Sequence, residues 1–393
     1  MGTLARRGID ARLWIAVALI IVAVLGIVGY LYVSMSGATT VTTTVTSIAT
    51  QTVTATKTSI VTETKVLEKV RTETVTRIFE KPVKVIDALG RSVEFEKVPK
   101  RVVCLAPSIT ELVFALGLGR YVVGVDSFSN YPPIVLDLVK SGRIAVVGGY
   151  WNPDVEKIVA LKPDLVLASA GVPSHVALES KLGESGIKVV YLRADRARDL
   201  SDIVADIQLV AQIFHAEDNA TKLVKKIVTE IQSIANALKS HNATKVRVLV
   251  LLSPPSYGLW TTGGGTFIDY LVTVAGGRNV FGDKHGWVQV SPEDIVARNP
   301  QVIIVTAMGV NATTARQIIE DLLKIPGISE VEAAKKGRIY VLTGEADDML
   351  TRPGPRISKA VLLLAKILHP EIFGEPQRSD VYSAKQLGVA VAT

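Results

Sequence analysis

The sequence predicts an α/β protein in which two lobes, each with a mostly parallel sheet, are joined by one long helix. Three observations predict this class: the chain has 393 residues, short aliphatic runs alternate with amphipathic stretches after Pro82, and a thirteen-residue pattern occurs twice. A chain of this length can bury two hydrophobic cores of ordinary size. Alternation of buried strands with helices is typical of a parallel sheet covered by helices.

The N-terminal segment predicts a membrane anchor. Residues 13–33 form a run of 21 residues without a charge, which is long enough as a helix to cross the hydrocarbon core of a bilayer. Arginines lie within residues 1–12, and positive charge stays preferentially in the cytoplasm. We therefore expect a cytoplasmic N-terminus, a single-pass anchor in the cell membrane and an extracytoplasmic globular part. A cleaved signal peptide is the alternative, because Ser34 and Ser36 offer small residues to a peptidase.

Residues 34–81 predict a threonine-rich stalk. Between Thr39 and Thr76 there are 16 threonines and neither glycine nor proline. Such a low-complexity tract cannot form a packed core, and its β-branched residues stiffen the backbone. We expect it to hold the globular part away from the membrane. Together with the Asn-Ala-Thr sequons at Asn219, Asn242 and Asn311, it leaves a surface structural glycoprotein as an alternative class.

Seven buried strands are predicted in two sets, separated by one long amphipathic helix. The strands are expected at Arg101–Leu105, Arg143–Val147, Asp164–Ala168 and Ile187–Leu192, and then at Val246–Leu252, Gln301–Thr306 and Arg338–Leu342. Between the sets, apolar residues from Leu223 to Leu238 recur at steps of three and four, which predicts a helix. The expected organisation is an N-terminal lobe at 82–216, a bridging helix at 217–243, a C-terminal lobe at 244–374 and a tail at 375–393.

The internal repeat supports two related lobes. EKIVALKPDLVLA begins at Glu156 and EDIVARNPQVIIV begins at Glu293, and each copy predicts a short helix, a proline and a buried strand. A carboxylate in the first turn of a helix is explained, taken singly, by the helix dipole. As a symmetric pair on two lobes, Glu156 and Glu293 could also dock onto matching cations of a two-fold symmetric partner.

Composition and motifs argue against a nucleic-acid-binding protein and against an enzyme. The net charge is +7, but Lys and Arg are interleaved with Asp and Glu, so no basic stripe is expected. The glycines at 263–265 are not followed by GKS or GKT, and no GxSxG pattern occurs. Asp347 and Asp348 are expected in a solvated loop. The widely spaced histidines, which offer no metal-ligand spacing, are His175, His215, His241, His285 and His369.

Six segments, in order, carry a resemblance to a known family. They are VIDALGRSVEF at Val85, RVVCLAPSITELVFALG at Arg101, SFSNYPP at Ser127, EKIVALKPDLVLA at Glu156, WVQVSPEDIVARNP at Trp287 and RPGPRI at Arg352. The chain from about residue 83 to 374 resembles the cobalamin and ferric-siderophore class of periplasmic solute-binding proteins of ABC importers. The resemblance implies two Rossmann-like lobes bridged by a rigid helix, an ABC permease dimer with its ATPase subunits as partner, and Glu156 and Glu293 as docking residues for permease arginines.

The same resemblance implies which residues line a ligand cleft between the lobes. It places Tyr131, Trp260, Trp287 and Arg352 there, and aromatic rings suit a broad, partly apolar chelate. An arginine could grip an anionic group of the ligand through its planar fork of donors, with a surface ion pair as the alternative role. Further candidates from their loop positions are Tyr150, Trp151, Ser108 and Thr262.

The expected ligand is a metal chelate, either cobalamin or a ferric siderophore. Ser169, Ala170 and Gly171 stand where the cobalamin binders of the family carry a bulky aromatic residue. This departure predicts a more open pocket wall and leaves haem or another metal complex, or an extracellular sensor role, as alternatives. We expect the Co or Fe to arrive inside the ligand, so that the protein has no metal site, no cofactor and no catalytic residue of its own.

Overall fold

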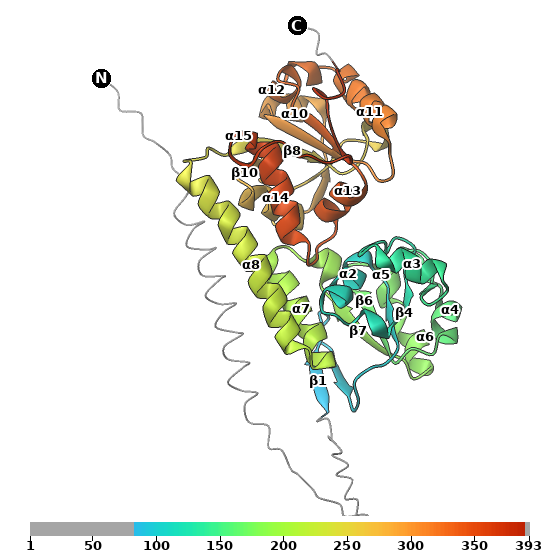
Figure 1. Ribbon diagram of the computed structural model, residues 1–393. Coiled ribbons are helices and arrows are strands. Elements are labelled where there is room, and N and C mark those ends of the chain that lie inside the picture. The colour runs from blue at the N-terminus through green and yellow to red at the C-terminus, as the bar shows by residue number, and fades with distance from the viewer. Residues whose placement is uncertain (1–81, 390–393) are drawn as a thin grey trace, which may run out of the picture.

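The protein is described by a computed structural model covering residues 82–389. Two lobes lie one above the other and are bridged along one side by helix α8, Glu217–Ser240 (Figure 1). The cytoplasmic segment, the anchor and the stalk expected at residues 1–12, 13–33 and 34–81 lie outside the described residues. Within residues 82–389, no helix combines the length and the apolar character needed to span a membrane.

The N-terminal lobe contains a five-stranded, fully parallel sheet with the strand order β5-β4-β3-β6-β7. An antiparallel hairpin of β1 and β2 precedes it. The strands are β1 Val83–Ile86, β2 Ser92–Phe95, β3 Val102–Cys104, β4 Val122–Val125, β5 Ala145–Val146, β6 Leu165–Ser169 and β7 Lys188–Leu192. The helices are α2 Pro107–Ala115, η1 Gly119–Tyr121, α3 Ile134–Lys140, α4 Val155–Ala160, α5 Pro173–Val176, α6 Glu179–Glu184, η2 Ala194–Arg196 and α7 Leu200–Phe214.

The C-terminal lobe has a mixed sheet in which β10, β8, β12 and β13 are parallel and β9, β11 and β14 run antiparallel to their neighbours. Its strands are β8 Val246–Leu251, β9 Trp260–Thr262, β10 Gly277–Asn279, β11 Trp287–Gln289, β12 Val302–Thr306, β13 Ile339–Leu342 and β14 Val381–Ser383. Its helices are η3 Pro255–Tyr257, α9 Phe267–Val274, α10 Pro292–Arg298, α11 Ala312–Lys324, η4 Ile328–Glu330, α12 Glu332–Lys335, α13 Gly344–Thr351, α14 Ile357–Leu368 and α15 Pro370–Phe373. All seven predicted strands are present, with bounds shifted by one or two residues.

Helix α8 joins the lobes through a buried apolar stripe. The stripe consists of Ala220, Val224, Ile227, Ile231, Ile234 and Leu238, and the period of three to four residues places these side chains on one face. This face packs against α7 of the N-terminal lobe and α14 of the C-terminal lobe. One hydrophobic cluster therefore continues from the first lobe through the helices into the second.

The sequence repeat is a structural repeat. Helices α4 and α10 are capped by the side chains of Asp154 and Ser291, and each leads to a fully buried central strand, β6 or β12. Both helices are followed by a residue with positive φ, Lys162 at 46° and Asn299 at 42°. Each stands directly before a proline, which cannot continue a helix and so fixes its end. In both copies, therefore, the helix begins at a side-chain cap, ends before a proline and is followed by a buried strand.

Candidate ligand-binding cleft

A cavity of about 370 Å³ lies between the lobes. The N-terminal wall belongs to loops at the carboxyl ends of parallel strands, where open α/β sheets place their ligands, and the C-terminal wall belongs to the start of α9, strand β11 and the end of α13. The N-terminal lobe contributes Gly171 and the β7–α7 loop, the C-terminal lobe contributes the start of α9 and Trp287, and the segment after α13 closes one side. The lining residues are Gly171, Asp195, Arg196, Ala197, Arg198, Gly265, Thr266, Phe267, Ile268, Trp287, Thr351 and Pro353.

Two tryptophans share one face of the ribbon formed by β9 and β11. Trp287 pairs with Thr262 and Gln289 pairs with Trp260, and both paired residues and residues two apart lie on the same side of a sheet. The side chains remain open, with 57% of Trp287 and 41% of Trp260 exposed. Trp287 lines the cavity itself, whereas Trp260 lies beside it on the same ribbon face.

Tyr150 and Trp151 follow β5 at the edge of the N-terminal lobe. Their rings meet edge to face with centroids 4.4 Å apart, and 67% of Trp151 is exposed. Burial, reinforced by the charge of Asp195, raises the pKa of Tyr150, so this residue is a neutral phenol. His175 supports the loop through Nε2, which lies 2.8 Å from the Tyr150 carbonyl, while its Nδ1 accepts from the Ser169 amide. Burial also lowers the pKa of His175, which indicates a neutral structural imidazole.

Ser108 and Thr262 do not lie in open loops, as the sequence had suggested. Ser108 is in the first turn of α2 and Thr262 is in β9, and both side chains are buried. The Thr262 hydroxyl is hydrogen-bonded to Thr266. The loops after the first strand of each lobe are shorter than expected, because helix α2 begins immediately and β8 is followed by a hairpin-like return through β9.

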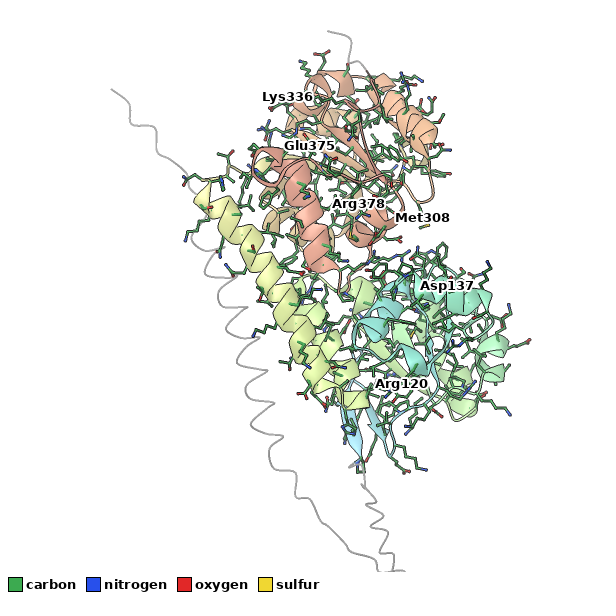
Figure 2. The ribbon with its side chains drawn as sticks, in the orientation of Figure 1. Arg120, Asp137, Met308, Lys336, Glu375 and Arg378 are labelled. Carbon is green, nitrogen blue, oxygen red and sulfur yellow. The ribbon has the colours of Figure 1, made fainter. Side chains whose placement is uncertain are left out.

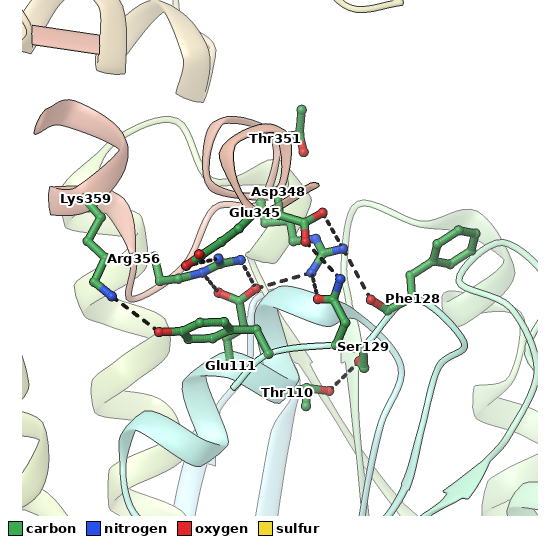
Figure 3. Close-up of polar contacts among 12 residues, drawn as sticks. Thr110, Glu111, Phe128, Ser129, Glu345, Asp348, Thr351, Arg356 and Lys359 are labelled. Atoms are coloured by element: carbon green, nitrogen blue, oxygen red, sulfur yellow. Dashed lines mark hydrogen bonds and ion pairs between the residues drawn. The ribbon is translucent and has the colours of Figure 1, made fainter. Parts of the chain in front are cut away.

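Arg352 is part of a polar network that connects the lobes beside the cleft. The network includes Glu111, Asp348 and Arg356 (Figure 3). Its guanidinium lies 2.6 Å from Asp348, donates to the Asn130 side chain at 2.7 Å and to the Phe128 carbonyl at 3.3 Å, and lies 3.5 Å from Glu111. Its neighbours Thr351 and Pro353 line the cavity. The structure therefore places Arg352 at the edge of the cleft, with its donors directed to protein acceptors.

Arg356 and Glu111 form the centre of this network. Arg356, at the start of α14, makes a two-pronged contact with Glu111 of α2 at 2.7 and 2.5 Å, and both side chains are buried. The Arg356 guanidinium also lies 4.2 Å from the centroid of the Tyr131 ring, whose hydroxyl accepts from Lys359 at 3.3 Å. Tyr131 thus lies in the contact between the lobes and is not among the residues that line the cavity.

Asp347 and Asp348 were expected in a solvated loop, and this expectation is wrong. Both lie in helix α13 and both are buried. The reason is that α13 packs against α9 and α14, which the local sequence does not reveal. Asp348 takes part in the network through Asn130 at 3.0 Å, whereas Oδ1 of Asp347 is buried without a hydrogen-bond partner.

Glu156 and Glu293 occupy equivalent places in the two lobes. Each lies in the first turn of its repeat helix, α4 or α10, and each is exposed. No salt bridge involves either carboxylate within the described part of the chain. Both are therefore free to meet cationic groups of another molecule.

The sequence did not single out several residues that are exposed or that line the cavity. Phe128, Tyr257 and Met308 are exposed large apolar side chains, and Met308 lies on the side of the C-terminal lobe that faces the N-terminal lobe (Figure 2). Arg196 and Arg198 line the cavity. The available signal for the arginines was their place directly after a predicted buried strand, Ile187–Leu192, at the sheet edge where ligands bind.

A metal site in a protein needs several metal-ligating side chains close together. Across residues 82–389, no group of three or more His, Cys, Asp or Glu side chains is arranged to hold a metal ion. Cys104 is buried in β3, the environment predicted from its strand-like surroundings.

Two α/β lobes, one bridging helix and a cleft at the carboxyl ends of both sheets define a two-lobed solute-binding protein. The chain belongs to the periplasmic binding protein family, whose sequence pattern matches residues 102–346. Membership makes it a binding component and not an enzyme.

Relatives support this assignment. The ABC transporter substrate-binding lipoprotein YvrC of Bacillus subtilis is 35% identical over 75% of this chain and 88% of its own length. A vitamin B12-binding protein of Salmonella typhimurium is 35% identical over 58% of this chain and 80% of its own. The periplasmic heme-binding protein RhuT of Roseiflexus has a similar structure, with a TM-score of 0.59, 26% identity and coverage of 69% of this chain and 98% of that one. The chain is thus a substrate-binding protein of the ABC transporter type.

Proposed function

We propose that this protein captures a metal chelate in the cleft between its lobes and delivers it to the permease of an ABC importer. The observation that carries the proposal is the cavity of about 370 Å³ walled by both lobes, with the exposed indole of Trp287 on one side. A ring of this kind can cover the face of a broad, flat ligand with little loss of rotamer freedom. Cobalamin, haem and ferric siderophores are the candidate ligands, in keeping with the vitamin B12-binding and heme-binding relatives.

Delivery requires a docking surface, and we assign it to Glu156 and Glu293. The two carboxylates are exposed at equivalent helix starts, one in each lobe. A permease dimer presents two equivalent surfaces, so a pair of matching anions on a pseudo-symmetric partner fixes both contact and orientation. The partners are then the permease subunits and their ATPase subunits.

The proposed location is the outer face of the cell membrane, with residues 13–33 as a single-pass anchor. A membrane-associated, extracytoplasmic place is supported by the lipoprotein relative. We propose that the metal is carried by the chelator and that the protein itself has no cofactor site. Tethering beside the importer would make docking effectively intramolecular.

The first test is direct capture of a chromophore. The full chain, purified in mild detergent, is mixed with cyanocobalamin, haem and a ferric catecholate siderophore, and then analysed by visible absorbance and native mass spectrometry. We expect one chelate to be retained at one molecule per chain. Retention of none of them would contradict the proposed function and favour a sensor or a surface structural role.

A further inference from the structure

We propose that Arg196 forms an anion subsite on the N-terminal wall of the cleft, so that the chelate carried by this protein bears anionic oxygen groups. The inference rests on the proposed function and narrows its substrate class. It assigns the ligand's carboxylate or catecholate edge to the β7–α7 loop, and its flat face to the side of the cleft that holds Trp287.

The β7–α7 loop is held in place by a buried carboxylate. Asp206 of α7 accepts the backbone amides of Arg193 at 3.0 Å and Ala194 at 2.8 Å. Ala194 has φ of 41°, a left-handed conformation that costs energy for a residue with a Cβ. Such a conformation persists only where the surroundings enforce it, and here it turns the chain so that Asp195, Arg196 and Arg198 reach the cavity.

Gly171 allows this loop to lie against the neighbouring β6–α5 turn. A Cβ at position 171 would come within 2.9 Å of the Arg196 Cγ and 3.3 Å of the Arg196 amide nitrogen, closer than van der Waals contact permits. The small residues at Ser169–Gly171 were expected to leave the pocket wall open. Instead, the stem of Arg196 occupies the space beside Gly171, so an arginine of the cavity lining closes this part of the wall.

The charge of Arg196 is not neutralised by the described chain. No salt bridge or side-chain hydrogen bond within residues 82–389 involves its guanidinium, and Arg196 is an exposed residue of the cavity lining. Arg198 contributes a second cation, whose Nε lies 3.5 Å from Asp202. Among the lining residues Asp195 carries the negative charge, but its Oδ2 atom is buried, in proximity to Tyr150, whose pKa its charge raises. The cavity wall therefore has an excess of positive charge.

Arg352 differs from Arg196 in that its guanidinium is bonded to other groups of the protein. The sequence pointed to Arg352 as the residue that grips an anionic ligand group, yet its guanidinium is already bonded to Asp348, Asn130 and Phe128. Arg196 has the chemistry expected of Arg352 without these protein partners. A planar fork of donors beside a half-enclosed cavity is suited to a carboxylate or a pair of catecholate oxygens.

The test compares ligands that differ in charge. The full chain is titrated with haem, haem dimethyl ester, a ferric catecholate siderophore and cyanocobalamin, first as wild type and then as Arg196→Ala. We expect an anionic chelate to bind, and Arg196→Ala to weaken its binding by at least about tenfold, the loss expected for one charge-assisted hydrogen bond. Arg196→Lys should restore part of the affinity, and Arg143→Ala, an exposed arginine in a loop before β5, should leave it unchanged.

The outcomes separate the two proposals. If the wild type binds only cyanocobalamin, or binds haem and its dimethyl ester equally, the anion subsite is overturned and the proposed function stands. The same holds if Arg196→Ala binds an anionic chelate as well as the wild type does. If the wild type binds none of the four ligands, both proposals are overturned. Because Arg196 is exposed, unchanged thermal unfolding of the variant will separate lost binding from lost folding.

Discussion

Asp347 is a carboxyl group that the fold keeps neutral. Burial, and after it the charge of Asp348, raises the pKa of Asp347 to about 7, against an ordinary value near 4 in an unfolded chain. The buried Oδ1 without a partner agrees with a protonated acid. In the folded state the group retains its proton at pH values where the unfolded chain has already lost it. Its contribution to stability is therefore fully present below about pH 4 and is lost as the pH rises through about 7.

We predict that Asp347→Asn stabilises the protein at high pH. The amide stays neutral, so the variant should exceed the wild type by about 4 kcal/mol in the free energy of unfolding at pH 8, with the difference shrinking toward pH 4. Urea unfolding at several pH values measures this, and Asp218→Asn on the exposed side of α8 serves as the control. A variant that is no more stable than the wild type at pH 8 would contradict the assignment.

Trp287 is the aromatic residue of the cavity wall, and we predict that Trp287→Ala weakens chelate binding by at least about 1 kcal/mol. Truncation of a central aromatic anchor removes contact area that water then occupies. Calorimetry with the ligand retained by the wild type gives the difference. Tyr257→Ala removes an exposed ring of the same lobe that does not line the cavity, and should have little effect. Equal affinities for wild type and Trp287→Ala would return this residue to a structural role.

The sequence was informative about single residues where local pattern decides their environment. Trp260 and Trp287 were expected in the cleft from the resemblance; both lie in short strands, and Trp287 lines the cavity. The resemblance placed Arg352 and Tyr131 near the cleft. The structure shows that both side chains already contact other groups of the protein. Asp348 is 4 residues from Arg352 in the sequence, whereas Glu111 is 241 residues away. The contact with Glu111 cannot be inferred from periodicity or composition.

At the scale of elements, α2 and α14 are linked by the buried Glu111–Arg356 pair. Burial raises the pKa of Glu111, and the hydrogen bonds and charge of Arg356 oppose this effect. Separating the lobes would leave both charges without compensation, and an unpaired buried charge is strongly unfavourable. The pair therefore links the two lobes in addition to the hydrophobic contacts of α8.

We predict that Glu111→Gln destabilises the protein by about 3 kcal/mol, because the buried Arg356 loses its buried counter-charge. Chemical unfolding measures the loss, and distances between spin labels placed one on each lobe should broaden if the lobes loosen. Glu345→Gln is the matched control, since Glu345 also contacts Arg356 but is partly exposed and pairs with Arg378 as well, and it should cost less than about 1 kcal/mol. A similar loss of unfolding free energy in both variants would contradict the prediction that the buried position of Glu111 makes its contact with Arg356 the more stabilising one.

The elements that the sequence predicted are those with long apolar patterns. The seven predicted strands and the helix α8 have continuous or periodic apolar residues. In contrast, β9, β10 and β11 have the sequences WTT, GRN and WVQ, in which glycine or polar residues interrupt the apolar run. β4 was missed because Gly124 interrupts its apolar run; a Cβ there would come within 2.8 Å of Leu161, so the glycine is needed for packing.

At the scale of the whole molecule, the pseudo-symmetry of the lobes places Glu156 and Glu293 as a pair. We predict that the double variant Glu156→Arg, Glu293→Arg abolishes delivery to the importer in reconstituted vesicles, because it replaces attraction by repulsion at both contacts. Affinity for the chelate should be nearly unchanged, since neither residue lines the cavity.

The control for this variant reverses charge elsewhere. Glu96→Arg with Glu375→Arg alters one exposed acid in each lobe away from the repeat helices and should leave transport intact. Transport at the wild-type rate by the Glu156→Arg, Glu293→Arg protein would contradict the docking assignment. Loss of transport in both double variants would indicate a general effect of net charge.

The chain passes between the lobes only once within the described residues, through α8, so each main sheet is built from one uninterrupted stretch of sequence. During synthesis from the N-terminus, residues 102–192 can complete the first sheet while the second is still being made. Arg356, which neutralises the buried Glu111, arrives among the last elements. A nascent chain therefore has a finished first lobe with an unmatched acid on its inner face, and the arrival of α14 is the step that completes the receptor.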